Sequence, residues 1–336
     1  MFDPKADSPL SDSVLREKKE RYARFDTESV VTRITQESLG VGVKKIEPLG
    51  TGANAFDHLV FSLHTDDGRV MVCRINADAL VAEDFPIEAE LYSAWRAAGV
   101  PSPEVYNVTM RDKADGLDYM LLESVGAGDL EKHLIQHPED AIEYARASGA
   151  FLAHLHTVSV PGFGMLALRK GLLQGSHATW REAIQVRLEE TLAYLVRHQL
   201  LSPEQEETVR AAVARNDALL DLDQSVTLHG DYHNANIIID EAREGIAAAI
   251  DLSQAKAGDP LYDLAFYSTY VSPETFKVFC EGYFPQADRP KDFEKKLALY
   301  QLRIYLSKAK LRKRFGYENR IPAAIEGVVH ALKQLA

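Results

Sequence analysis

Residues 227 to 251 contain the side chains whose types and spacing could do chemistry. Asp231 and Asn236 stand in the order Asp-x-x-x-x-Asn, and a further carboxylate, Asp251, follows at the end of an apolar run. One carboxylate can accept a proton from an attacking hydroxyl, while an amide oxygen and a second carboxylate can hold Mg²⁺ on the phosphates of a nucleotide. The hypothesis is phosphoryl transfer, with Asp231 as the catalytic residue and Asn236 and Asp251 as metal ligands.

A run of predicted strands precedes this stretch and could position the nucleotide. Short β-type segments separated by turn signals predict three antiparallel strands, at 43–49, 56–63 and 70–75. The first turn could lay backbone N–H groups over phosphates, although a plain hairpin also favours glycines there. Its residues for this role are Gly50, Gly52 and Asn54.

Arg74 lies on the third predicted strand, where a cation could pair with phosphates. An ordinary surface arginine is the alternative. The segment from Glu88 to Gly99 has helical spacing and ends at a glycine. Either Glu88 or Glu90 could reach back to Arg74, and we favour Glu88.

Two more predicted strands, 105–108 and 119–123, complete a five-stranded antiparallel sheet. The second strand runs into a glycine-containing connector at 124–128, which is either a hinge between two lobes or a simple linker. The exposed backbone of this connector could bind a purine edge. The residues expected to do so are Glu123, Ser124 and Val125.

After Gly128 the pattern becomes helical. Asp129 is expected to cap a helix that extends to His137, and the Pro161 to Gly164 segment is expected to be a compact turn. Lys and Arg residues between Lys308 and Arg314 are expected to form a solvated helix face. The remaining predicted helices cover residues 139–157, 180–198, 203–221, 261–271, 273–284, 291–315 and 319–335.

Composition limits the possible function classes. The 336 residues and 46% hydrophobic content suffice for a full core, and the net charge of −12 argues against general nucleic-acid binding. An acidic surface would attract a cationic small molecule, although cytoplasmic enzymes are often acidic. The two cysteines suggest neither disulfides nor a zinc site, and no apolar run is long enough for a membrane span. A cytoplasmic protein without membrane or nucleic-acid partners is expected.

Two phrases of the sequence resemble the motifs of the aminoglycoside phosphotransferase family when they occur together. They are His229-Gly-Asp231-Tyr-His-Asn-Ala-Asn236 and Ile250-Asp251-Leu-Ser-Gln-Ala-Lys-Ala-Gly-Asp259-Pro-Leu-Tyr-Asp263. Looser patterns extend the resemblance over most of residues 40–285. A finer likeness, to the hygromycin B phosphotransferases, rests on the Val72-Cys-Arg74-Ile-Asn76 strand and on the Ile-Asp-Leu-Ser-Gln-Ala phrase.

The resemblance implies an α+β, bilobal, protein-kinase-like fold. A helical extension would cover residues 1–39, and a small lobe with a five-stranded antiparallel sheet and one helix would cover 40–125. The larger, mostly helical lobe would cover 126–336. The implied enzyme transfers the γ-phosphoryl group of ATP or GTP, with Mg²⁺, to a hydroxyl of a cationic aminoglycoside and so confers antibiotic resistance. It would be a monomer or a homodimer.

The resemblance also implies roles for individual residues. Arg74 would pair with the nucleotide phosphates and with Glu88, and the backbone of 123–125 would contact the purine. Asp263 and His229 would support the catalytic loop structurally. Tyr270 falls near a position where the hygromycin B enzymes present an aromatic residue to the substrate.

Departures from the pattern leave alternatives open. Arg74 replaces the Lys of most members, Gly230 replaces the Arg of a protein-kinase His-Arg-Asp, and Ser253 replaces the Gly of Asp-Phe-Gly. The last two favour a small-molecule kinase over a protein kinase. The acceptor could instead be a macrolide, choline, homoserine or a sugar derivative. A nucleotide-binding pseudokinase without turnover is the remaining alternative.

Overall fold

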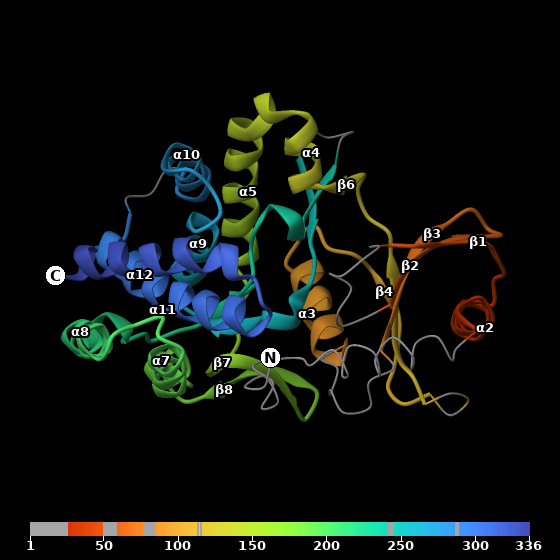
Figure 1. Cartoon of the computed structure of the whole chain (residues 1–336). Helices are drawn as coiled ribbons and strands as arrows, with labels where there is room; N and C mark the ends of the chain where they lie inside the picture. Colours follow the sequence, from red (N-terminus) through yellow and green to blue (C-terminus); the bar gives the residue numbers. More distant parts are fainter. Residues whose placement is uncertain are drawn as a thin grey trace. The chain divides into compact units, whose positions relative to one another are not determined.

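The computed structural model describes residues 26–49, 59–76, 85–112, 114, 116–240, 245–285 and 289–336. These residues form two compact units that divide between Gly126 and Ala127. In Figure 1 the first unit runs from red to yellow and the second from yellow-green to blue. The predicted phosphate-binding residues of the first turn, Gly50, Gly52 and Asn54, lie outside the described residues.

The N-terminal unit is built on the predicted five-stranded antiparallel sheet, with strand order β1-β2-β3-β5-β4. Its strands are β1 (Val43–Pro48), β2 (Leu59–Thr65), β3 (Val70–Asn76), β4 (Val105–Thr109) and β5 (Asp118–Glu123). Helix α2 (Thr27–Leu39) precedes the sheet, and helix α3 (Phe85–Ala97) follows β3. The five-stranded antiparallel sheet expected from the sequence is confirmed.

The two helices pack on opposite faces of this sheet. Alternate side chains of a strand point to opposite faces, so Met71 and Cys73 lie on one face while Arg74 lies on the other. Val31 and Ile34 of α2 join the core on the first face. On the second face, α3 contributes Phe85, which packs with Met120, Leu122 and Val72. Arg74 therefore points toward the side covered by α3.

The C-terminal unit is mostly helical and carries two small sheets, β11-β10-β6 and β8-β7-β12-β9. Its strands are β6 (Gly128–Asp129), β7 (Phe163–Arg169), β8 (Leu172–His177), β9 (Val226–Leu228), β10 (Ile237–Asp240), β11 (Gly245–Ala249) and β12 (Lys256–Gly258). Its helices are α4 (Leu130–Gln136), α5 (Ala141–Leu155), α6 (Trp180–Gln185), α7 (Leu188–Arg197), α8 (Pro203–Arg215), α9 (Leu261–Ser268), α10 (Pro273–Tyr283), α11 (Phe293–Arg314) and α12 (Ile321–Leu335).

The β7–β8 hairpin is a correction to the sequence analysis, which expected only a turn at 161–164. Lys170 and Gly171 connect the two strands, and both have positive φ angles of 54° and 77°. Two consecutive left-handed residues match the twist of a tight hairpin. On its other edge β7 pairs with β12, the strand that follows Asp251 in the sequence.

The helix expected over 180–198 is in fact two helices, α6 and α7. Arg187 adopts a left-handed φ of 57° at the break. The freed carbonyl groups of Ile184 and Val186 accept hydrogen bonds from the guanidinium of Arg303, which is buried. The break therefore depends on a side chain far away in sequence, from α11.

Close helix packing completes this unit. Helix α10 packs against α5, and α11 packs against α12. Glycines allow the first contact: a Cβ atom at Gly149 would collide with the carbonyl of Phe279, and one at Gly282 with the carbonyl of Arg146. Among the described residues, no helix combines the length and the apolar character that crossing a membrane requires.

Candidate active site

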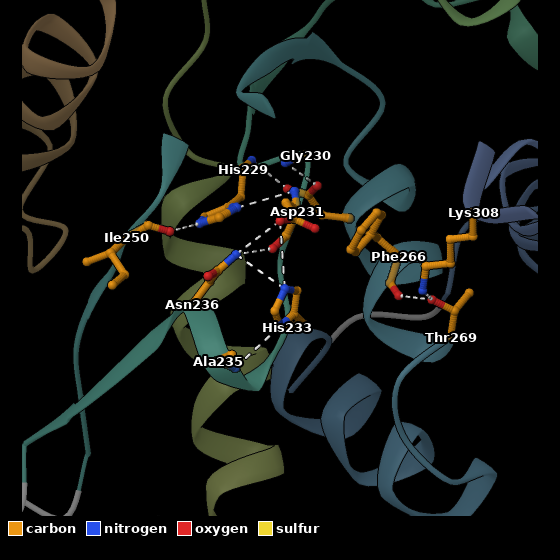
Figure 2. Close-up of polar contacts among 11 residues, drawn as sticks. His229, Gly230, Asp231, His233, Ala235, Asn236, Ile250, Phe266, Thr269 and Lys308 are labelled. Carbon is orange, nitrogen blue, oxygen red and sulfur yellow. Dashed lines mark hydrogen bonds and ion pairs between the residues drawn. The ribbon is translucent and has the colours of Figure 1, made fainter. Parts of the chain in front are cut away.

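His229 fixes the start of the loop that carries Asp231. The imidazole is buried between β9 and the end of β11. Its Nδ1 accepts the backbone N–H of Asp231 at 3.3 Å, and its Nε2 donates to the carbonyl of Ile250 at 2.9 Å (Figure 2). Burial lowers the pKa of His229, against the opposing effect of Asp263 and the other nearby carboxylates. The neutral ring can thus accept at one nitrogen and donate at the other.

Asp263, on α9, holds the backbone of the same loop. Its carboxylate is fully buried and accepts the N–H groups of His229 at 2.7 Å and of Gly230 at 2.8 Å. A third hydrogen bond comes from Nε2 of His156 at 3.2 Å. Burial alone would raise the pKa of Asp263, but the hydrogen bonds and the neighbouring imidazoles outweigh it and lower the pKa. The ionised carboxylate is the form that accepts all three bonds.

Gly230 explains one departure from the protein-kinase pattern. Its φ of 80° lies in the left-handed region, which disfavours a side chain. A Cβ atom there would also collide with the carbonyl oxygen of Gln254. The segment after Asp251 thus lies directly against Gly230, and no arginine fits at this position.

Asn236 lies beside Asp231, with its side-chain amide nitrogen facing that residue. Nδ2 of Asn236 donates to the Asp231 carbonyl at 2.9 Å and to its carboxylate oxygen Oδ2 at 3.2 Å. Figure 2 shows the amide oxygen of Asn236 on the side away from Asp231. The Asp231 side chain is 27% exposed, so its carboxylate is accessible to a small molecule.

Asp251 follows immediately after Ile250, whose backbone N–H donates to the Asn236 carbonyl at 2.9 Å. Asp251 is exposed and adopts a left-handed φ of 63°. The backbone of Asn236 is therefore hydrogen-bonded to the residue that precedes Asp251. Mg²⁺ accepts oxygen donors and commonly takes one or two carboxylates together with substrate phosphates. In the described part of the chain, no three His, Cys, Asp or Glu side chains gather as a protein-only metal cage.

The expected pair of Arg74 and Glu88 is present in the N-terminal unit. Nη1 of Arg74 lies 2.5 Å from the Glu88 carboxylate, and the two side chains are only 11% and 2% exposed. The guanidinium also lies 5.1 Å from the ring centre of Phe85. Arg74 is consequently held in place, unlike a free surface arginine.

The connector residues Glu123 to Val125 follow the end of β5. The N–H of Glu123 donates to the Glu104 carbonyl at 2.8 Å, and the N–H of Ser124 donates to the Val70 carbonyl at 3.2 Å. The N–H of Val125 has no hydrogen-bond partner among the residues that the structure describes. All three residues are half-buried.

The ring of His233 lies between Tyr270 and Asp231 and contacts both. Nε2 of His233 is 3.7 Å from the Asp231 carboxylate, and the His233 ring stacks on Tyr270 with centres 4.6 Å apart. Phe266 extends the cluster, 5.5 Å from Tyr270. Tyr270 is 48% exposed, so part of its ring is available for contact. His233 and Phe266 were not singled out in the sequence.

The expectation of a solvated face between Lys308 and Arg314 is wrong. Lys310 is buried, Lys308 is half-buried, and Nζ of Lys308 lies 3.5 Å from the ring centre of Tyr270. Helix α11 packs against α7, α9 and α12, so little of its surface is left to solvent. Long aliphatic stems can cover apolar surface in such a helix.

His156 was not singled out in the sequence, and it has a specific structural role. Besides its bond to Asp263, its Nδ1 contacts the hydroxyl of Tyr283 at 2.8 Å. The residues come from α5, α9 and α10, and the last two helices lie more than 100 residues downstream of His156. The sequence around His156 carries no information about these partners.

The sequence and the fold together identify the class of protein. The sequence profile of the phosphotransferase enzyme family matches residues 47–297, and the chain belongs to this family. No curated protein sequence matches the chain.

Solved structures of several small-molecule kinases have similar folds, which confirms the α+β, protein-kinase-like fold expected from the sequence. The aminoglycoside phosphotransferase APH(4)-Ia, in a ternary complex with AMP-PNP and hygromycin B, is 21% identical, with a TM-score of 0.68 over 91% of this chain and 99% of that one. A putative fructosamine-3-kinase from Thermobifida fusca is 19% identical, with a TM-score of 0.62 over 89% and 98%. The macrolide 2′-phosphotransferase MphH from Brachybacterium faecium is 18% identical, with a TM-score of 0.57 over 90% and 98%.

Proposed function

We propose that this protein transfers the γ-phosphoryl group of ATP or GTP to a hydroxyl of an aminoglycoside-like small molecule. The observation that carries the proposal is the geometry around Asp231. Its carboxylate is accessible, while its backbone is held by His229 and its side chain contacts Asn236. A group fixed in this way can align an attacking hydroxyl without having to reorganise during the reaction.

Asp231 would act on the acceptor. A carboxylate within hydrogen-bond reach of the hydroxyl can orient it and accept its proton as the new bond to phosphorus forms. The buried Asp263 has no such access, because its oxygens are occupied by backbone and imidazole donors. We therefore assign Asp263 to structural support of the loop.

Asn236 and Asp251 would hold Mg²⁺ through their side-chain oxygens. The orientation of the Asn236 amide supports this assignment, because its nitrogen faces Asp231 and its oxygen faces away (Figure 2). When bound, the metal ion supplies positive charge that stabilises the phosphates during transfer.

Arg74 would bind the nucleotide phosphates, with Glu88 keeping the guanidinium in position. The connector would bind the purine through its backbone, with the N–H of Val125 as the available donor. The phosphate contact and the purine contact do not involve the acceptor, so both are compatible with any small-molecule substrate of the family. Gly50, Gly52 and Asn54 remain candidates for covering the phosphates.

A second class of acceptor is supported by Lys308. A cation beside Tyr270 would repel the ammonium groups of a fully basic aminoglycoside. Alternative acceptors are therefore a sugar derivative, homoserine, choline or a macrolide. The position of Lys308 beside Tyr270 favours those with fewer cationic groups.

Release of nucleoside diphosphate tests the proposal. We expect Mg²⁺-dependent release from ATP or GTP to be stimulated by at least one member of a panel containing hygromycin B, other aminoglycosides, macrolides, choline, homoserine and sugar derivatives. Asp231→Asn should lower the turnover roughly 10²- to 10⁴-fold, because the amide cannot accept the proton. Its stabilisation by nucleotide in a thermal melt should remain.

Asp223→Asn provides the matched control, because Asp223 is exposed and lies in the loop before β9. Its turnover should equal that of the unmodified protein. Near-normal turnover in Asp231→Asn would falsify the catalytic assignment. Thermal stabilisation by nucleotide without product from any acceptor would instead favour the pseudokinase.

A further inference from the structure

Lys308 directs its ammonium group toward the cluster that surrounds Asp231. Nζ donates to the hydroxyl of Thr269 at 2.5 Å and lies 3.5 Å from the ring centre of Tyr270 and 5.0 Å from that of Phe266. Figure 2 shows the side chain extending from α11 toward Phe266 and Thr269 of the α9 region. The ring of Tyr270 is shared, because His233 stacks on it and approaches the Asp231 carboxylate.

A second cation lies one helical turn from Lys308. Residues i and i+4 of a helix are neighbours on one face, which places Arg312 beside Lys308. Nη1 of Arg312 donates to the carbonyl of Arg320 at 2.6 Å, a neutral partner. Within the described ranges, neither Lys308 nor Arg312 has a carboxylate within ion-pairing distance. Other basic residues of α11 do, as in the pairs Lys296–Asp259 and Lys313–Glu318.

The lack of a counter-charge is costly at this position. Burial and the neighbouring Arg312 lower the pKa of Lys308 to about 7, against the opposing effect of Asp231. Burial also lowers the pKa of Arg312. Besides Asp231, Glu131 of α4 is a nearby carboxylate, because its charge helps to raise the pKa of Tyr270. Two partly buried cations close together are stabilised when an anion binds between them.

We propose that Lys308 and Arg312 bind a carboxylate of the acceptor, while Tyr270 packs against its carbon skeleton and its reactive hydroxyl contacts Asp231. The inference rests on the proposed phosphoryl transfer and changes its acceptor from an aminoglycoside to an acidic or zwitterionic hydroxyl compound. Ammonium groups of the acceptor would have to point away from this side of Asp231. Lys308 and Arg312 are then specificity-determining residues, and a substrate consisting only of ammonium-bearing rings is disfavoured.

Glucose and two sugars that each differ from it at one carbon test the charge preference: glucuronate, which carries a carboxylate, and glucosamine, which carries an ammonium group. Nucleoside diphosphate release is measured with each, for the unmodified protein, Lys308→Met and Arg312→Gln. A hydrogen bond between charged groups contributes about 1.5–3 kcal/mol, so kcat/KM for glucuronate should exceed that for glucosamine by at least roughly tenfold. In both variants this ratio should fall about tenfold or more, while the KM for the nucleotide stays unchanged.

Lys313→Met is the matched control, because Lys313 lies on the same helix but already pairs with Glu318. It should keep the glucuronate preference. Glucosamine turned over as well as glucuronate by the unmodified protein overturns the inference. The inference is also overturned if the preference for glucuronate persists in Lys308→Met and Arg312→Gln. The same holds if these substitutions change only the KM of the nucleotide.

Binding of the same sugars separates this inference from the proposed reaction. If no sugar stimulates nucleotide consumption, thermal melts with and without each sugar still measure which charge the site accepts. Stabilisation by glucuronate that exceeds that by glucose, and that is lost in Lys308→Met, supports the subsite. Equal stabilisation by glucuronate and glucose overturns it. Failure of phosphoryl transfer itself is shown independently, by the absence of Asp231-dependent product with every acceptor of the larger panel.

Discussion

At the scale of single residues, the conformation of the loop that carries Asp231 depends on the buried carboxylate of Asp263. Its two oxygens accept three N–H groups, and each bond requires an acceptor. Asp263→Asn would place an NH₂ group against at least one of these donors. Because a buried donor left without its acceptor costs about 1–3 kcal/mol, the loop should shift or lose stability.

We expect Asp263→Asn to lower kcat much more than it raises the KM of the nucleotide, since the loop carries the proposed catalytic Asp231, whereas the proposed purine contacts lie at 123–125. Steady-state nucleoside diphosphate release and a thermal melt measure the two effects. Asp292→Asn serves as the control: Asp292 is exposed, and its left-handed φ of 61° is well tolerated by asparagine. Unchanged kcat in Asp263→Asn would show that the buried bonds do not position the loop.

The types of these residues were predictable, but their partners were not. Asp231, Asn236 and Asp251 could be singled out as candidates, because their types and spacing are compatible with phosphoryl transfer. Lys308 and His156 carried no comparable signal, because their contacts to Tyr270 and Asp263 join segments that are far apart in sequence. A side chain that acts through tertiary contacts leaves no local pattern to detect.

At the scale of elements, the sequence predicted the five-stranded sheet and most helices because their periodicity is local. The β7–β8 hairpin was missed although Lys170-Gly171 is a plausible two-residue turn, since β7 (Phe163–Arg169) has no clean alternation of polar and apolar residues. The break between α6 and α7 was missed for another reason. It depends on Arg303 of α11, which no local pattern could indicate.

The contact between α5 and α10 gives a prediction at this scale. Gly149→Ala would gain up to about 1 kcal/mol from helix propensity if the helix were free. Its Cβ atom would instead meet the backbone of Phe279 and Tyr283, so the two helices must separate. Overpacking of this kind costs about 1–3 kcal/mol, and the midpoint of thermal unfolding should fall.

The same substitution should also reduce turnover. His156 directly follows α5 and Tyr283 ends α10, so separating the two helices would stretch the hydrogen bonds that link Tyr283 through His156 to Asp263. Turnover measured well below the unfolding midpoint distinguishes this effect from simple loss of folded protein. An increased midpoint with unchanged turnover would mean that α5 and α10 approach less closely than the structure shows.

At the scale of the whole molecule, the net charge is negative, whereas basic side chains lie near Asp231. The chain carries a formal charge of −12, yet the side of Asp231 next to α11 presents Lys308 and Arg312. The net value suggested a cationic substrate, whereas the local arrangement favours an anionic one. Because screening in water limits the reach of exposed charges to about 8 Å at physiological salt, the local groups should dominate in the site.

The buried cation also makes the stability of the molecule depend on pH. The pKa of Lys308 is about 7 in the folded protein and 10.5 in its ordinary state, so between these values the unfolded chain binds more protons. Stability must then rise with pH across this window, and the penalty for burying the charge is greatest below pH 7. Lys308→Met removes the penalty. Its melting temperature should exceed that of the unmodified protein most at pH 6.5, and this difference should shrink at pH 9.5. Lys313→Met should show no such trend, and a difference independent of pH would mean that Lys308 stays charged throughout.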